Sequence, residues 1–440
     1  MGRIAVIGGG LAGLTSATLL AQQGHGVTLF EHKTLGGMAA SESRDGFTWN
    51  WGGHALYRRG PGVPILRSLG VRPRGFVVKG APYMHALYDG AVVPAPFSAR
   101  TALSPLLEPA DRMEFLRVMS SVPLHARGSR VTQRNDVSWA SWLDEQVSRP
   151  RVRELVGALV RLTSFTHDPE RQSAAAALRQ LFLGAGGVWY LHDGWQQLVD
   201  GLREAALRAG VDIREHQRVS AVDHDTKVRA VQFTDGHSLD VDGAVIAAGG
   251  PRVVSRLLDG PGADIVSEWD RAAVPVRAAT WELNLRTRRD GPHVWVLGVD
   301  TPVYLNVQSH FAQGLAPQGT SMVHVLRYLG PQDPSAAHRD EMTKVLDLAL
   351  PGWRDEVIDD RFLPALTVMH DMPLAANGGF AGRPGPAVPG VDGLMVAGDW
   401  VGRRGILADA ALASAQDAAK MLDDYLVGPS ARQAHEQAVR

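Results

Sequence analysis

Three glycines near the start of the chain have the spacing that binds the phosphates of a dinucleotide. Gly8, Gly10 and Gly13 form a G-x-G-x-x-G motif. The first glycine allows a tight turn, the second lets the backbone approach a pyrophosphate, and the third lets a helix pack closely on a strand. Leu11 and Ala12, the first residues of the following helix, would present free N–H groups to the phosphates. We therefore expect a dinucleotide to bind here.

The residues around this motif have the order of a strand-helix-strand unit. Residues 4–7 are apolar and β-like, residues 11–23 have helical periodicity, and residues 27–30 form a second apolar run that ends at Glu31. An isolated glycine motif is often only a glycine-rich loop, but this complete order favours a dinucleotide-binding fold. Glu31 is placed to accept hydrogen bonds from an adenosine ribose, and its charge would repel a 2′-phosphate.

Further motifs follow along the chain. Gly36 and Gly37 come soon after the acid in HKTLGGMAASES, and a second glycine pair ends a strand-like stretch in GFTWNWGGHALY. A late segment reads VAGDWVGRRGILADAALAS, in which an apolar strand, Asp399 and a helix of small residues succeed one another. In this order the motifs resemble the superfamily that contains flavin amine oxidases, phytoene-type desaturases and protoporphyrinogen oxidase. The turn GRRGILADAALAS departs from the superfamily's common G-x-x-G-A-x-x-S-G spacing, which leaves its individual amides unassigned.

The resemblance implies that the cofactor is FAD, enclosed by segments from both ends of the chain. Asp399 matches the superfamily's G-D motif near the ribityl chain and pyrophosphate, and Val219 matches a position that packs on the adenine. The helix after Gly405 would point its positive N-terminal end at the flavin. The residues that the resemblance places at the cofactor are Gly8, Gly10, Leu11, Ala12, Gly13, Glu31, His32, Gly36, Gly37, Met38, Gly52, Gly53, His54, Val219, Ala248, Gly249, Gly398, Asp399, Gly405, Ile406, Leu407 and Ala408. No metal is expected.

The implied fold class is α/β, with a Rossmann-type FAD-binding domain assembled from discontinuous segments. A chain of 440 residues exceeds what one hydrophobic core usually supports. We expect residues 1–54, 188–265 and 388–440 to form the FAD-binding domain, and residues 55–187 and 266–387 to form an inserted substrate-binding domain. The first insert has mostly helical periodicity, and the second has runs rich in valine and aromatics. These patterns predict an α+β substrate domain with helices and a mixed or antiparallel sheet.

Composition excludes several classes of function. The formal net charge of -1 offers no electrostatic reason to bind nucleic acid. The chain has no cysteine, which excludes disulfides, thiolate metal sites and a cysteine nucleophile. A secretory signal and a run of roughly 18 apolar residues are both missing, so we expect a cytoplasmic protein without an integral membrane segment. The expected partner is a small-molecule substrate, and the oligomeric state is not indicated.

Residues beside the flavin motifs are candidates for a substrate pocket. They are Trp51, Tyr57, Trp281, Tyr304, Asn306 and Trp400. His54, directly after Gly52 and Gly53, is the candidate catalytic residue, because a neutral imidazole there would serve as a base or hydrogen-bond donor. The alternative for His54 is a structural histidine bonded to the backbone, and the alternative for the aromatic residues is an ordinary place in the core.

The resemblance predicts an FAD-dependent oxidoreductase that takes a hydride from a mostly apolar small molecule, by desaturation or oxidation. No second G-x-G-x-x-G follows a strand, which disfavours a nicotinamide domain, so the electrons are expected to pass to O2 or another small acceptor. Many amine oxidases of this superfamily place a lysine beside the flavin, but residues 281–328 contain none. This disfavours amine oxidation, which stays open as an alternative.

Two more functions stay open as hypotheses. GFTWNWGGHALY followed by ALYDGAVVPAPFS is also similar to UDP-galactopyranose mutase, a redox-neutral flavoenzyme. A flavin-binding protein without turnover is the last hypothesis, since a fold alone does not establish catalysis.

Overall fold

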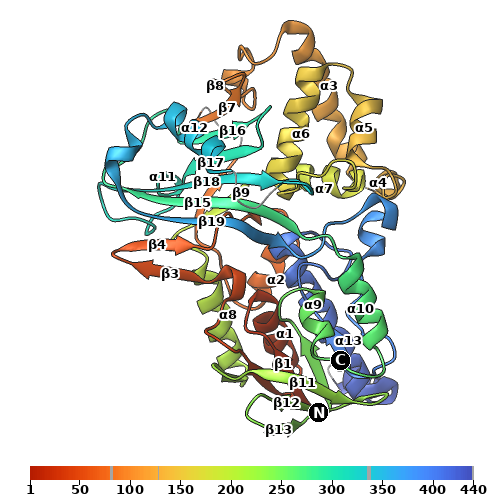
Figure 1. Cartoon of the computed structure of the whole chain (residues 1–440). Helices are drawn as coiled ribbons and strands as arrows, with labels where there is room; N and C mark the ends of the chain where they lie inside the picture. Colours follow the sequence, from red (N-terminus) through yellow and green to blue (C-terminus); the bar gives the residue numbers. More distant parts are fainter. Residues whose placement is uncertain (80–82, 127, 334–337, 439–440) are drawn as a thin grey trace.

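Two stacked regions make up the molecule, as Figure 1 shows: a lower one around a parallel sheet and an upper one around a larger sheet. The computed structural model describes residues 1–79, 83–126, 128–333 and 338–438. Both marked chain ends lie in the lower region.

The lower region is built on a five-stranded sheet in which every neighbouring pair is parallel. The strand order is β10-β2-β1-β14-β20, so strands from the start, the middle and the end of the chain lie side by side. Ligands bind at the carboxyl ends of such strands, where the order changes direction between β1 and its neighbour β14. The strands are β1 (Arg3–Ile7), β2 (Gly26–Phe30), β10 (Asp212–Arg214), β14 (Gly243–Ile246) and β20 (Leu394–Val396).

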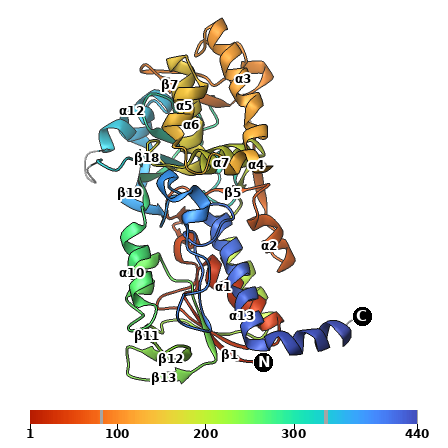
Figure 2. The same ribbon diagram turned by 90° about the vertical axis from the view of Figure 1, so that its right-hand side faces the viewer.

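Both faces of this sheet are covered, which explains why its strands are continuous apolar runs rather than alternating ones. One face packs against α1, α8 and α13, and the other against a small sheet and two helices. Figure 2 shows α1 and α13 running side by side. The covering elements are α1 (Leu11–Gln22), α8 (Gln196–Arg208), α13 (Leu407–Ala438), β11 (Val219–His224), β12 (Val228–Phe233), β13 (Ser238–Asp240), α9 (Pro251–Ser255) and α10 (Ala263–Ala272).

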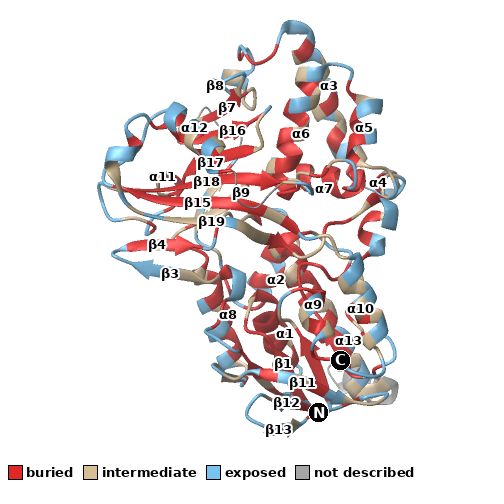
Figure 3. Ribbon diagram, viewed as in Figure 1, coloured by how far each residue is buried: buried red, intermediate tan, exposed pale blue. Residues whose placement is uncertain are grey.

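The upper region is built on a seven-stranded sheet in the order β19-β15-β18-β17-β16-β7-β8. All of its pairs are antiparallel except β16 with β7. Its central strands are buried on both faces, as the red strands in Figure 3 show. The strands are β7 (Met84–Tyr88), β8 (Ala91–Pro94), β15 (Val276–Leu285), β16 (Trp295–Gly298), β17 (Val303–Val307), β18 (Ser321–Leu329) and β19 (Val357–Met369).

Helices and two small sheets complete the molecule, with α2 (Gly62–Ser68) packed against α13 in the lower core and the other helices around the upper sheet. These other helices are α3 (Pro109–His125), α4 (Gly128–Thr132), α5 (Trp139–Gln146), α6 (Pro150–Ser164), α7 (Ala174–Ala185), α11 (Gln308–Phe311) and α12 (Arg339–Ala349). The small sheets are β3 (Ser41–Arg44) with β4 (Phe47–Asn50), and β5 (Leu56–Tyr57) with β9 (Val188–Leu191) and β6 (Gly75–Val78). Short 3-10 turns are Gly37–Ala39, Ala99–Thr101, Trp353–Glu356, Ala375–Asn377 and Gly379–Gly382.

The predicted fold class is confirmed. The parallel sheet takes its strands from the three segments expected to bind FAD, and the large sheet takes its strands from the two inserts. The exact domain boundaries stay a prediction. The hairpin of β7 and β8 lies in the insert expected to be mainly helical; Asp89 and Gly90 both have positive φ at its turn, as a tight two-residue hairpin loop requires.

No helix in the described part of the chain combines the length and apolar character needed to cross a membrane.

Candidate functional site

The glycine-rich turn lies at the carboxyl end of β1 and leads directly into α1. Gly8 has a φ of 107°, which favours glycine. A Cβ atom on Gly13 would lie 1.8 Å from the carbonyl oxygen of Gly8, so any side chain there would force α1 away from the turn. The close approach brings the first N–H groups of α1, at Leu11 and Ala12, to the edge of the sheet.

Glu31 at the end of β2 is tied to this turn. Its carboxylate accepts hydrogen bonds from the backbone N–H groups of Gly9 and Lys33, both at 2.8 Å. His32 Nδ1 lies 2.9 Å from the same carboxylate. Glu31 is therefore buried over the turn, where the sequence predicts the ribose contact.

The turn at Gly36 and Gly37 packs on the first glycine motif. Gly36 N donates to Gly9 O at 2.8 Å, and both glycines of the pair have positive φ. Met38 follows on the surface with its side chain partly exposed. The structure thus brings the glycine turn, Glu31 and the second glycine pair together.

The late segment reaches the same edge of the sheet. A Cβ atom on Gly8 would be 2.9 Å from Ala247 O, in the loop that continues as Ala248 and Gly249. Trp400, directly after the G-D motif, donates from Nε1 to Gly249 O at 3.1 Å. The loop after β14 therefore lies between the first glycine motif and the G-D motif, and the two chain ends meet as predicted.

Asp399 is held by residues from the end of β19 and from the loop before β20. His370 donates from its backbone N–H to one carboxylate oxygen at 3.1 Å, and its Nδ1 lies 2.9 Å from the other. Burial alone would lower the pKa of His370, but the Asp399 carboxylate outweighs it, and the net shift is upward. Arg383 donates to the carbonyl oxygens of Asp399 and Gly405, which ties the G-D motif to the turn before α13.

The turn before α13 is shaped by Leu407, which has a φ of 56°. Ile406 and Leu407 are buried, and Ala408 packs partly against the lower core. The first turn of α13 thus starts at the loop that carries Asp399.

Gly52 and Gly53 lie against the upper sheet. A Cβ atom on Gly52 would be 2.7 Å from Leu366 and 3.1 Å from Thr280, and one on Gly53 would be 2.9 Å from Leu326. Phe165, at the end of α6, also contacts Gly53. The second glycine pair therefore marks where the loop from the lower region meets an apolar face of the upper one.

Both ring nitrogens of His54 lie within hydrogen-bond distance of backbone carbonyl oxygens, and the neutral ring donates to one of them. Nδ1 lies 2.9 Å from Gly52 O, and Nε2 lies 2.7 Å from Met38 O. Burial lowers the pKa of His54, and these two carbonyls act in the opposite direction. The ring links the turn at Met38 to the glycine pair, which is the structural role that the sequence leaves open for it; a catalytic role stays a prediction.

Three buried tyrosines and the half-buried Tyr190 gather beyond the glycine pair. Tyr190 and Tyr304 share a hydrogen bond between their hydroxyls, and Asn306 Nδ2 donates to both, at 3.0 and 2.9 Å. The Tyr57 hydroxyl donates to a main-chain carbonyl, and Tyr328 lies near these rings. Burial raises the pKa of all four. Tyr57, Tyr304 and Asn306 are among the predicted residues. Tyr190 is not, because the local sequence GAGGVWY does not show that its strand pairs with the strand of Tyr57.

The other predicted residues lie elsewhere. Trp281 is on the face of β15 opposite to Thr280, where its Nε1 donates to Asp360 at 2.7 Å. Trp51 is 40% exposed, and its ring faces the Arg361 guanidinium at 4.5 Å. Trp400 packs near Trp269 in the lower region, next to Gly249. Val219 is buried at the start of β11 in the core that also contains Phe30, before Glu31.

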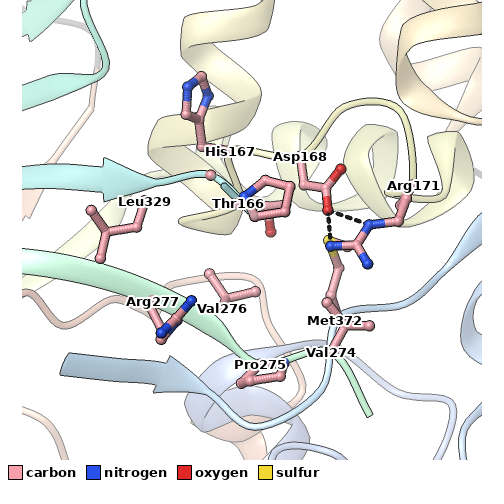
Figure 4. A pocket seen from close by; sticks show the side chains of 12 residues that line it. Thr166, His167, Asp168, Arg171, Val274, Pro275, Val276, Arg277, Leu329 and Met372 are labelled. Atoms are coloured by element: carbon pink, nitrogen blue, oxygen red, sulfur yellow. Dashed lines mark hydrogen bonds and ion pairs between the residues drawn. The ribbon is translucent and has the colours of Figure 1, made fainter. Parts of the chain in front are cut away.

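A cavity beside Thr166, His167 and Asp168 is shown in Figure 4. Its volume is about 30 Å³, room for water rather than for an organic substrate. Asp168 and Arg171 form an ion pair at its rim. A larger cavity of about 380 Å³ opens on the other side of Thr166 and His167, along α5 and α6. Burial, followed by Arg161 and Arg327, lowers the pKa of His167 to about 4.

The residues present fit the flavin dinucleotide that the sequence predicts. At the phosphate end, the lack of a side chain on Gly13 lets α1 approach the glycine turn closely. At the other end, buried polar atoms on the sheet face beside Gly52 have no hydrogen-bond partner among the described residues: Thr280 Oγ1, Glu282 Oε1, both ring nitrogens of His324, and Asn306 Oδ1. The ring edge of a flavin carries N–H and C=O groups, which are suitable partners for such atoms.

Comparisons with known proteins agree with this geometry. A family model described as flavin containing amine oxidoreductase matches residues 11–281, more than half of the chain. The chain is 29% identical to 15-cis-phytoene desaturase of Synechococcus elongatus over 195 residues, which are 41% of this chain and 40% of that protein. It is 23% identical to 4,4'-diaponeurosporene oxygenase of Staphylococcus aureus over 275 residues, 54% of each. The matches thus span about half of these relatives' length or less.

Solved structures share the whole architecture. An oxidoreductase from Methanosarcina mazei has a TM-score of 0.73 at 20% identity, with 95% of this chain and 100% of that chain covered. Cyclohexylamine oxidase from Brevibacterium oxydans has a TM-score of 0.69 at 18% identity, with 97% and 100% covered. At identities of 20% and 18%, this structural similarity shows a shared fold.

Proposed function

This chain belongs to the family of flavin containing amine oxidoreductases. On that basis we propose that it is an FAD-dependent oxidoreductase that removes a hydride from a mostly apolar small molecule. The reaction is a desaturation or an oxidation, and the electrons pass to O2 or another small acceptor. FAD, when bound, supplies the hydride acceptor.

The apolar surface beside Gly52 and Gly53 is the observation that carries this proposal. Side-chain atoms of Leu326, Leu366 and Phe165 lie 2.7–3.2 Å from the positions that Cβ atoms on the glycine pair would take. The buried tyrosines continue this surface into the upper region, and they offer ring faces and neutral hydroxyls rather than charge. Such a lining suits an apolar or aromatic substrate.

The absence of lysine from residues 281–328 disfavours an amine substrate handled as in the amine oxidases that use one. The sequence matches to a relative named as a phytoene desaturase and to one named as a diaponeurosporene oxygenase, rather than as amine oxidases, support the same direction. Desaturation is accordingly favoured over amine oxidation.

Different residues of the chain would bind different parts of the dinucleotide. The N–H groups of the first turn of α1 and the backbone near Gly10 would hold the pyrophosphate. Glu31 would accept hydrogen bonds from the ribose, and Asp399, fixed by His370, would orient the middle of the dinucleotide. The turn at Gly52 and Gly53 would place the reactive ring against the apolar surface.

Anaerobic incubation of the FAD-loaded protein with a panel of isoprenoid, polyketide, indolic and amine compounds tests the proposal. We expect an apolar compound to bleach the oxidised flavin absorbance and to be recovered with two fewer hydrogens or as its oxidised form. Bleaching by amines alone would overturn the substrate class. Turnover of a nucleotide sugar without accumulation of reduced flavin would instead identify a redox-neutral mutase.

A further inference from the structure

Four polar residues form a straight row across the upper sheet. Arg361 on β19 is paired in register with Glu282 on β15, Glu282 with His324 on β18, and His324 with Asn306 on β17. Residues directly opposite each other on neighbouring strands share a face, so all four side chains lie on the side of the sheet that carries Thr280 and meets Gly52. We call Arg361, Glu282, His324 and Asn306 the polar row.

Its two central members are completely enclosed. Glu282 and His324 are each 1% exposed, which is rare for ionisable side chains unless they are fully paired. One oxygen of Glu282, Oε2, accepts hydrogen bonds from Arg361 Nε and Nη2. The other, Oε1, lies 3.2 Å from His324 Nε2, but the two atoms are not aligned for a hydrogen bond. One oxygen of the carboxyl group is therefore available for a proton, and the neutral ring beside it offers one N–H and one acceptor nitrogen.

The charges that face the pair come from three neighbouring elements. Arg361 on β19 forms ion pairs with both Glu282 and Glu42 of β3. Its Nη1 atom lies 3.4 Å from Glu42 Oε2. His54 faces His324 from the loop after β4. Burial raises the pKa of Glu282 to about 7, although Arg361 and the Gly52 N–H act to lower it. Burial, then His54 and Arg361, lowers the pKa of His324 to about 3.

We propose that Glu282 and His324 form a proton-holding pair beside Gly52 and Gly53, and that the pair takes up one proton when the bound cofactor is reduced. This rests on the proposed function, because it requires the reactive ring of FAD to lie against the glycine pair. Two-electron reduction brings negative charge into a low-dielectric site, and an unprotonated Glu282 would repel that charge. The electrons come from the reductant, the proton comes from water, and the new bond is an O–H bond on Glu282.

The pair balances charge beside the cofactor and does not touch the substrate. Below about pH 7 Glu282 already carries its proton, so reduction draws in nothing further at this site. Above about pH 7 the carboxylate is ionised, and reduction must be accompanied by proton uptake. The midpoint potential of the flavin should then fall more steeply with pH above this point than below it.

Potentiometric titration of the FAD-loaded protein with dithionite tests the pair. Each proton taken up in a two-electron step adds about 30 mV of fall per pH unit. We expect this extra slope in the wild type above about pH 7 and its loss in Glu282→Gln, which keeps the size of the side chain but cannot ionise. Glu42→Gln is the matched control, because it also removes a carboxylate from Arg361 but lies at the surface; its slope should equal that of the wild type. An unchanged slope in Glu282→Gln would overturn the proposal.

Infrared spectroscopy of the wild-type apoprotein provides a second test that does not require the variant to fold. A protonated carboxyl group shows a C=O band that an ionised one lacks, and labelling glutamate with a 13C side-chain carboxyl shifts that band. We expect a label-sensitive band at pH 6 that disappears by pH 8; its absence at pH 6 would refute the pair. Buried aspartates such as Asp409 do not interfere, since they are unlabelled. Failure of the wild type to take up FAD would instead contradict the proposed function. The infrared band of the apoprotein would still test whether Glu282 holds a proton.

Discussion

Replacement of Gly13 by alanine isolates the close contact on which the nucleotide site depends. The new Cβ atom would lie 1.8 Å from Gly8 O, whereas a comfortable C···O contact is roughly 3.3 Å. The turn and α1 would therefore have to separate by roughly 1.5 Å. Alanine in a helix gains about 1 kcal/mol over glycine, but overpacking of this kind costs about 1–3 kcal/mol, occasionally more. We expect a net loss of stability of up to about 2 kcal/mol.

The same shift moves the N–H groups that would hold the pyrophosphate. A loss of about 1.4 kcal/mol in binding is tenfold in Kd, so we expect Gly13→Ala to weaken FAD binding at least tenfold. The assay is titration of the apoprotein with FAD, followed by quenching of flavin fluorescence, together with thermal melting of the apoprotein and the loaded protein.

Gly157 in α6 offers a matched control, because it is also helical but nothing lies within 4 Å of a Cβ atom built there. Gly157→Ala should keep only the helix gain and raise stability by up to about 1 kcal/mol, with unchanged FAD affinity. Wild-type FAD affinity and a wild-type or higher melting temperature in Gly13→Ala would refute the reasoning.

Four further substitutions probe the buried polar groups. Asp409 at the start of α13 is buried, and burial raises its pKa from 3.8 to about 7. Because the folded protein binds this proton more tightly than the unfolded chain, the free energy of unfolding falls as the pH rises from about 4 to about 7. Asp409→Asn should therefore flatten the fall in melting temperature over this pH range. Asp399→Ala removes both bonds to His370 and should weaken FAD binding in the same titration without preventing folding, and unaltered affinity would contradict the assigned contact. Tyr57→Phe removes a hydrogen bond and should lower the free energy of unfolding, measured in urea, by about 1 kcal/mol. Tyr328→Phe should leave it unchanged, because the Tyr328 hydroxyl has no hydrogen-bond partner among the described residues. Equal effects of the two substitutions would contradict both assignments.

Local signals were sufficient for the nucleotide-binding half. The strand, turn and helix around Gly8, Gly10 and Gly13 are written in consecutive residues, and Glu31 ends the next strand at the expected spacing. The link to Asp399 depended on a resemblance between motifs, and the adjacency of β1, β14 and β20 confirms the architecture that it implied.

Cross-strand register limited what could be predicted for the upper half. In TWELNL every residue is buried, so alternation does not show which side chains face Gly52, and Trp281 was expected at the site when Thr280 and Glu282 are the residues that face it. β19 was not anticipated at all, because its pattern contains Pro364 and mixes exposed and half-buried positions. Without β19 there is no reason to place Arg361 beside Glu282.

The central position of β14 between β1 and β20 has a consequence for biosynthesis. While a ribosome is still translating, β14 has one partner and an open edge, and such an edge is prone to pair with other chains. FAD is expected to bind only after the segment from β20 onward has left the ribosomal exit tunnel. A chain that terminates before Leu394 should therefore be colourless and prone to aggregation.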